Sequence, residues 1–297
     1  MRLSVQWNPL ANKWLLSALV LLALFLIYTA VYATGVLDVS TLQAELFLMH
    51  RPLTPVDCMF YEWRNFGEIP FTLAFLVILS IFCFLARYRW QAIPLLFLLF
   101  AFGTGAELVG KAVFNQPLSF NIRAGMTTLT CPQLEGQSST SLKIAAALGL
   151  WWKIPAASEA IKNKKDEVAQ GPVTFDAGSN ENGYPGGHAT RSAFIGLLVA
   201  WLASRHIKPR SIRLPVVVVA STLAFLGGFM QFYIGSHFIT DTISGYLLGS
   251  SMACCAIGFL LLNPGRRKPT QQPASFPHDD WSNEETLELS QGGRSWS

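Results

Sequence analysis

Residues 183–204 read GYPGGHATRSAFIGLLVAWLAS, in which a polar, glycine-rich start is followed at once by an apolar run. A second stretch repeats this order, with GSHFITD at 235–241 leading into the apolar residues 241–262. Apolar runs of roughly 20 residues are long enough to cross a bilayer as helices. The whole chain is 51% hydrophobic and 13% charged, which is far more apolar than a typical soluble domain of its size. The sequence therefore predicts an integral membrane protein.

Six apolar runs are candidate membrane spans, and we expect an all-α six-helix bundle. The runs lie at 14–34, 69–86, 91–113, 187–204, 214–234 and 241–262. Their boundaries are expected only to within several residues, and the second and fourth are near the short end of the range. Residues 14–262 would form one membrane domain between a short N-terminus, 1–13, and a C-terminal tail, 263–297.

Basic residues mark every second connection between these runs. They are Arg2 and Lys13; Arg87 and Arg89; Arg205, Lys208, Arg210 and Arg213; and Arg266, Arg267 and Lys268. Lys and Arg in short loops are retained on the cytoplasmic side. This pattern predicts that both termini are cytoplasmic in a multi-pass protein of the plasma (inner) membrane, and that the connections 35–68, 114–186 and 235–240 face outward.

The first run has a positive start and an apolar core, as a secretory signal has. Its core is longer than the usual 7–15 residues of a signal peptide, and residues 28–34 offer only a weak small-residue cleavage pattern. We therefore interpret the first run as a membrane anchor.

The 114–186 connection is far longer than an ordinary helix-to-helix loop. Within it, residues 139–165 mix apolar side chains with lysines and carry Trp151 and Trp152. This composition fits an interfacial helix with the tryptophans at headgroup level, and fits equally a solvated loop. Cys58 and Cys131 both fall on the outer side, where a disulfide between them is possible but not indicated by any spacing.

The tail from residue 264 is rich in Pro, Gln, Ser and acidic residues, with little to build a core, and we expect it to be disordered in the cytoplasm. The formal net charge of +4 gives no case for binding nucleic acid, because the basic residues cluster in the loops that orient the spans.

Four ionisable side chains lie at the outward ends of three runs: Lys111, His188, His237 and Asp241. An ionisable group at such a depth is expensive and indicates function by default. Taken singly, a histidine at a membrane boundary is more often an interfacial hydrogen-bonding residue, and a lone lysine usually extends to lipid headgroups. The convergence of four such groups on one membrane face favours a catalytic site.

His237 and Asp241 are four residues apart, so on a helix they would share one face. The carboxylate would then accept from one imidazole nitrogen, fix the tautomer and leave the other nitrogen to attack. This makes His237 a candidate nucleophile that forms a phosphohistidine. His188 is a candidate general acid and base for the departing alcohol and the incoming water.

Three further residues are candidates for holding a phosphoryl group. Gly186 and Gly187 let backbone amides approach an anion closely, and they start a helix whose positive end faces that anion. Lys111 supplies positive charge for the phosphoryl oxygens. No Cys or His spacing typical of a metal site occurs, so the pattern favours phosphoryl transfer without a metal or other cofactor.

In motif order and placement the chain resembles the type 2 phosphatidic acid phosphatase superfamily, whose signature is K-x6-R-P, then P-S-G-H, then S-R-x5-H-x3-D. The matching positions are Lys111 in the first element, Pro185, Gly187 and His188 in the second, and His237 and Asp241 in the third. The resemblance covers roughly residues 69–262. It implies a six-helix fold with His237 as nucleophile, Asp241 as its orienting acid and His188 as acid and base, with no metal required.

Several positions depart from that signature. Where the family has its phosphate-binding arginines, the motif proline and the serines, this chain has Leu118, Ser119, Gly186, Met230 and Gln231. A preorganised donor aimed at transition-state charge is worth about 2.7–4 kcal/mol, so either other residues substitute for the missing donors or the activity is severely reduced.

Three residues are candidates to substitute. Arg191 lies one turn past His188, Arg123 follows the first motif, and Gln231 still donates through its amide. An unpaired guanidinium would be costly three residues into a span, so Arg191 should pair with a phosphate, with Asp241, or structurally with a carboxylate such as Glu107.

These observations predict a hydrolase that removes phosphate from a lipid phosphate or lipid pyrophosphate at the outer membrane face. Undecaprenyl pyrophosphate, phosphatidic acid and phosphatidylglycerol phosphate all fit such a site. A lipid phosphotransferase would use the same residues. The missing arginines keep open a different class, a non-catalytic protein that binds lipid headgroups or a partner protein.

Overall fold

The structure is a computed structural model, and it describes residues 9–50, 56, 59–60, 63–114, 183–234 and 236–262. The chain divides into two units, Met1–Gly265 and Arg266–Ser297, and every described residue belongs to the first. Several sequence predictions fall outside the described residues: the interfacial helix at 139–165, the Cys58–Cys131 pair, the role of Arg123 and the disordered tail.

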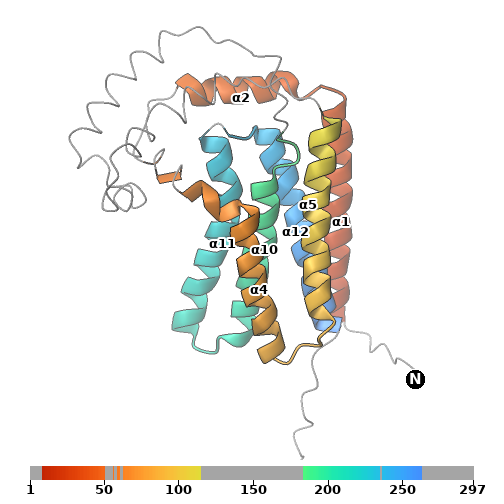
Figure 1. The fold of residues 1–297 in the computed structure, drawn as a ribbon, viewed down its shortest axis with the longest axis vertical. Coiled ribbons are helices and arrows are strands. Elements are labelled where there is room, and N and C mark those ends of the chain that lie inside the picture. Colours follow the sequence, from red (N-terminus) through yellow and green to blue (C-terminus); the bar gives the residue numbers. More distant parts are fainter. Residues whose placement is uncertain are drawn as a thin grey trace, which may run out of the picture. The chain divides into compact units, whose positions relative to one another are not determined.

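All regular elements in the described ranges are helical (Figure 1). They are α1 (Pro9–Ala33), α2 (Asp38–His50), the short 3-10 helix η1 (Arg64–Gly67), α4 (Ile69–Leu85), α5 (Ala92–Val113), α10 (Gly187–His206), α11 (Arg210–Tyr233) and α12 (Ile239–Leu262). Six of these helices coincide with the six apolar runs to within a few residues. Helix α2 and η1 lie in the 35–68 connection, where the sequence predicted no helix.

Four of the described helices are long and apolar enough to cross a membrane: α1, α5, α11 and α12. Helix α4 is apolar but shorter, with 17 residues. Large apolar side chains are exposed along these helices, such as Leu16 and Leu19 of α1, which are 62% and 64% exposed. Exposed leucines in this density are expected of helices that face lipid.

Helix α12 lies at the centre of the packing and contacts α1 and α10 most extensively. Ser251 of α12 donates to the carbonyl of Ala18 of α1 at 2.8 Å, which satisfies its hydroxyl inside the apolar core. Leu248 and Ile257 of α12 are buried in the same core as Leu198 of α10. A partnered hydroxyl in such a core avoids the penalty of an unsatisfied polar group.

Glycines allow α10 to approach its two neighbours closely. A Cβ added at Gly249 of α12 would overlap the carbonyl oxygen of Thr190, and one added at Gly245 would lie 2.7 Å from the Cβ of Ala189. On the other side, a Cβ added at Gly196 of α10 would lie 2.5 Å from that of Ala224 of α11. Small residues at helix contacts are typical of membrane bundles. They place the N-terminal ends of α10 and α12 side by side, where the candidate site lies.

Candidate active site

The candidate site lies where the C-terminal end of α5 and the N-terminal ends of α10 and α12 meet. The amide of Gly186, which precedes α10, donates to the carbonyl of Asp241 in the first turn of α12 at 2.9 Å. The His188 and His237 rings are 5.7 Å apart between centroids. The structure therefore brings together both histidines and the aspartate that the sequence singled out.

His237 lies in the turn before α12 and not on the helix. Helix α12 begins at Ile239, so the expectation that His237 and Asp241 share a helix face is wrong, although they are four residues apart. The turn is held by the carbonyl of Gln231, which accepts from the amides of Ser236 at 2.8 Å and His237 at 3.1 Å. Gln231 is 4% exposed, so α11 supplies a buried support for the nucleophile candidate.

Asp241 is completely buried, and its carboxylate is directed at the turn that carries His237. Its Oδ2 accepts from the amide of Phe238 at 3.2 Å and lies 3.5 Å from Nδ1 of His237. That second distance is longer than a hydrogen bond, and Nδ1 has no hydrogen-bond partner among the described residues. Of the two ring nitrogens, Nδ1 is the one that faces the aspartate.

His188 is the second residue of α10, and η1 covers one edge of its ring. A Cβ added at Gly67 would lie 2.5 Å from Cδ2 of His188, so the backbone of η1 packs directly on the imidazole. Nothing in the sequence pointed to Gly67, because it is far from the motifs along the chain.

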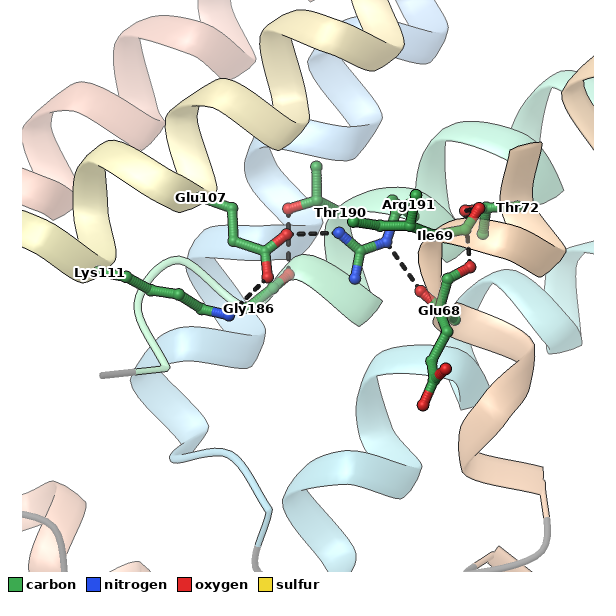
Figure 2. A network of polar contacts seen from close by, with 9 residues as sticks. Glu68, Ile69, Thr72, Glu107, Lys111, Gly186, Thr190 and Arg191 are labelled. Atoms are coloured by element: carbon green, nitrogen blue, oxygen red, sulfur yellow. Dashed lines mark hydrogen bonds and ion pairs between the residues drawn. The ribbon is translucent and has the colours of Figure 1, made fainter. Parts of the chain in front are cut away.

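Lys111 and Arg191 meet on one carboxylate, that of Glu107 (Figure 2). Lys111 Nζ donates to Oε1 of Glu107 at 2.8 Å, and Nη1 of Arg191 donates to Oε2. Nε of Arg191 donates to the carbonyl of Gly67 at 2.8 Å. Of the partners that the sequence allowed for Arg191, Glu107 is the one with which the structure shows an ion pair. The ion triad Lys111–Glu107–Arg191 is therefore the charged part of the site.

The two motif glycines have different surroundings from those predicted. The amide of Gly186 joins α10 to α12 through Asp241, so it does not face an anion as expected. A Cβ added at Gly187 would overlap the carboxylate of Glu107, which lies against the first residue of α10. The anion at this helix N-terminus is thus a side chain of the protein itself.

Gly183 and Tyr184 belong to the site although the sequence analysis gave them no role. A Cβ added at Gly183 would overlap Oδ2 of Asp241 and lie 2.7 Å from Nδ1 of His237. The hydroxyl of Tyr184 is 2.7 Å from that of Thr29 in α1, and its ring stacks on Tyr32 at 4.3 Å. Burial raises the pKa of Tyr184, so its hydroxyl stays protonated at neutral pH. The GYPGGH segment is in this way fixed between α1 and α12.

No group of three or more His, Cys, Asp or Glu side chains that could hold a metal ion occurs in the described part of the chain. Cys83, Cys254 and Cys255 are free thiols on α4 and α12.

Comparisons with known proteins agree with this architecture. The model of the PAP2 superfamily matches residues 138–263, which include His188, Arg191, His237 and Asp241. Phosphatidylglycerophosphatase B of Bacillus subtilis (strain 168) is 30% identical over 77 residues, which are 26% of this chain. The match spans 38% of that relative's length.

The fold is similar to that of a solved structure, described as the first transmembrane PAP2 type phosphatidylglycerolphosphate phosphatase from Bacillus subtilis. The TM-score is 0.51 at 18% identity, covering 82% of this chain and 95% of that one. At this identity the likeness concerns the fold alone, and it agrees with an integral multi-pass membrane protein. The PAP2 superfamily model matches less than half of this chain, so that family is what the chain is similar to over residues 138–263.

Proposed function

We propose that this protein is a metal-independent phosphatase of lipid phosphates or lipid pyrophosphates that acts through a phosphohistidine on His237. The observation that carries the proposal is the pair of histidine rings 5.7 Å apart, with the buried Asp241 at 3.5 Å from Nδ1 of His237. Nucleophile, orienting acid and a second histidine within one site are the groups that covalent phosphoryl transfer requires.

The reaction proceeds in two steps. In the first, Nε2 of His237 attacks phosphorus, the bond to the leaving oxygen breaks, and His188 donates its proton to that oxygen. In the second, the now neutral His188 takes a proton from water, whose oxygen attacks phosphorus and breaks the bond to His237. Phosphate leaves, and His188 is again protonated. Asp241 stabilises the positive charge that develops on the ring of His237.

The negative charge on the phosphoryl oxygens is stabilised by the motif lysine, Lys111, and by Arg191, which stands in for the arginines that the motifs lack. Both cations are bonded to the carboxylate of Glu107, which lies against Gly187, the residue that precedes His188. The side-chain amide of Gln231, at the position of a motif arginine, is a further candidate donor. The amide of Gly186 is left out of this set because it is bonded to Asp241.

We further propose that α1, α4, α5, α10, α11 and α12 are the six membrane spans, with both termini cytoplasmic and the site at the outer face of the plasma membrane. Helix α10 carries Arg191 near its outer end and Arg205 at its inner end, so its composition is the least apolar of the six. A site at this depth suits an amphiphilic substrate whose tail stays in the bilayer.

The test is phosphate release by the purified protein in detergent with EDTA present. The substrates are phosphatidic acid, phosphatidylglycerol phosphate and undecaprenyl pyrophosphate. We expect release from at least one of them, loss to background in His237→Ala, and a fall of about 10²–10⁴ in rate in His188→Ala. Activity that disappears with EDTA, or that persists in His237→Ala, would contradict the proposal.

A non-catalytic lipid-binding protein is the second candidate, because Glu107 already engages both Lys111 and Arg191 and the motif arginines are absent. Such a protein would bind the same lipids without releasing phosphate, and His237→Ala would leave its affinity unchanged. A transferase needs an acceptor, so the assay is repeated with an added alcohol. Binding of every substrate without release or transfer of its phosphate in either assay would favour this candidate.

A further inference from the structure

Glu107 lies outside the family signature, and the sequence suggested it only as a structural partner of Arg191. The residue is 8% exposed, and its carboxylate is bonded through Oε1 to Lys111 and through Oε2 to Arg191 (Figure 2). It lies directly against Gly187, the residue before His188. The carboxylate thus occupies the place beside the candidate acid and base where both cations converge.

A carboxylate and a phosphoryl group compete for the same donors, because the oxygens of both groups accept hydrogen bonds from guanidinium and ammonium groups. Arg191 is 5% exposed, and its Nε is fixed to the carbonyl of Gly67. A buried guanidinium of this kind needs a negative partner at all times. In this structure Glu107 supplies that partner.

The three side chains differ in exposure. Arg191 is buried and bonded on two sides, whereas the side chain of Lys111 is 40% exposed. Glu107 reaches the triad through its own rotatable side chain from α5. When a phosphoryl group replaces the carboxylate, the arginine can stay in place and the glutamate can withdraw.

We propose that Glu107 is an internal anion that occupies the phosphoryl-binding position between Lys111 and Arg191 until a phosphate ester or pyrophosphate displaces it. The inference rests on the proposed function, since it assumes that these two cations bind the substrate's phosphoryl group. Glu107 then sets the affinity and charge preference of the site: with the carboxylate present, anion binding is weakened and a low-charge phosphoryl group is favoured over a dianionic one.

The test compares Glu107→Gln with Glu68→Gln in the purified full chain. Both changes remove one negative charge and keep the side-chain volume. Glu68 precedes α4, is exposed, and Figure 2 shows its carboxylate directed away from Arg191. Inorganic phosphate is titrated at constant ionic strength, and binding is followed by calorimetry and by the shift in thermal unfolding. We expect Glu107→Gln to bind phosphate about tenfold or more tightly than the parent, and Glu68→Gln to stay within about twofold.

Two additions keep the result decisive. If Glu107→Gln does not fold, Glu107→Asp retains the charge but is too short to bridge both cations, and it should show the same direction of change. Short-chain phosphatidic acid is titrated in parallel in the His237→Ala background, where it is not consumed. A gain with this lipid but none with inorganic phosphate would assign the effect to the acyl chains and overturn the inference.

Unchanged or weaker phosphate binding in folded Glu107→Gln would also overturn the inference, because Glu107 would then hold the cations in place without competing. The titration needs no turnover, so it separates the two proposals. Tighter phosphate binding in a protein that releases no phosphate would refute the hydrolysis and keep the internal anion. Turnover by the parent protein, together with an unchanged phosphate affinity in Glu107→Gln, would support the hydrolysis and refute the internal anion.

Discussion

At the residue scale, Asp241 combines a structural and a chemical role. Its backbone carbonyl accepts from Gly186 and from the hydroxyl of Ser244, and its carboxylate accepts from Phe238 while facing His237. The same residue therefore ties α10 to α12 and faces the nucleophile candidate. A carboxylate held this firmly is preorganised, which is the property that electrostatic catalysis depends on.

The sequence could identify the ionisable groups of the candidate site but not the residues that only contact them. His188, His237, Asp241 and Lys111 were singled out because ionisable residues at span ends are rare and expensive. Gly67 was not found, since its contacts with His188 and Arg191 are long-range and a glycine in a loop has no distinctive pattern. The helical interpretation of His237 failed because the turn is defined by the carbonyl of Gln231, which no side-chain pattern reveals.

Substituting Gly183 should damage catalysis and also lower stability by the amount expected of overpacking, about 1–3 kcal/mol. In Gly183→Ala the new methyl group would overlap the carboxylate of Asp241 and press on His237, and the buried aspartate cannot move aside. We expect kcat to fall at least about tenfold, because a small displacement of reacting groups has a large effect on rate. Steady-state kinetics and a thermal melt measure both effects.

Gly105→Ala is the matched control, since a Cβ at Gly105 on α5 would meet nothing within 4 Å. It should leave kcat unchanged and raise stability slightly, because alanine is the better helix former by about 1 kcal/mol. Unaltered kcat in Gly183→Ala would show that the close approach of this segment to Asp241 is irrelevant to activity.

At the element scale, the apolar runs defined the helices well because length and hydrophobicity suffice for a membrane span. Helix α2 was missed because it has only 13 residues and mixes polar with apolar side chains, so neither criterion applies. The apolar runs do not show which helices are in contact. The close contact of α10 with α12 depends on Gly245 and Gly249, whose role becomes visible only when both helices are seen together.

The contact of α10 with α12 should couple stability to activity. In Gly249→Ala the added methyl group overlaps the carbonyl of Thr190, so the two helices must separate. Overpacking of this kind costs about 1–3 kcal/mol. Because His188 starts α10 and Asp241 lies in the first turn of α12, kcat should fall together with the melting temperature. A variant with a lower melting temperature but the parent's kcat would separate the site from this contact.

At the scale of the whole molecule, the proposed topology follows from the basic residues between the spans. The fold alone does not show which side of the membrane each end of the helices faces. Six spans place both termini inside and the 114–186 connection outside. We expect a fluorescent-protein fusion at the C-terminus to be bright and an alkaline phosphatase fusion there to be inactive. Alkaline phosphatase inserted within 114–186 should be active. Active alkaline phosphatase at the C-terminus would require either an odd number of spans or the inverted orientation with both termini outside.

If turnover passes through a phosphate bound to His237, that phosphohistidine can be trapped. The protein is mixed with a lipid substrate labelled with ³²P in the transferred phosphate and quenched in alkali, in which phosphohistidine is stable, and the labelled peptide is identified by mass spectrometry. We expect an alkali-stable, acid-labile label on His237 that is absent in His237→Ala and decays more slowly in His188→Ala. Turnover with no label on His237, or with a label on another residue, would contradict it.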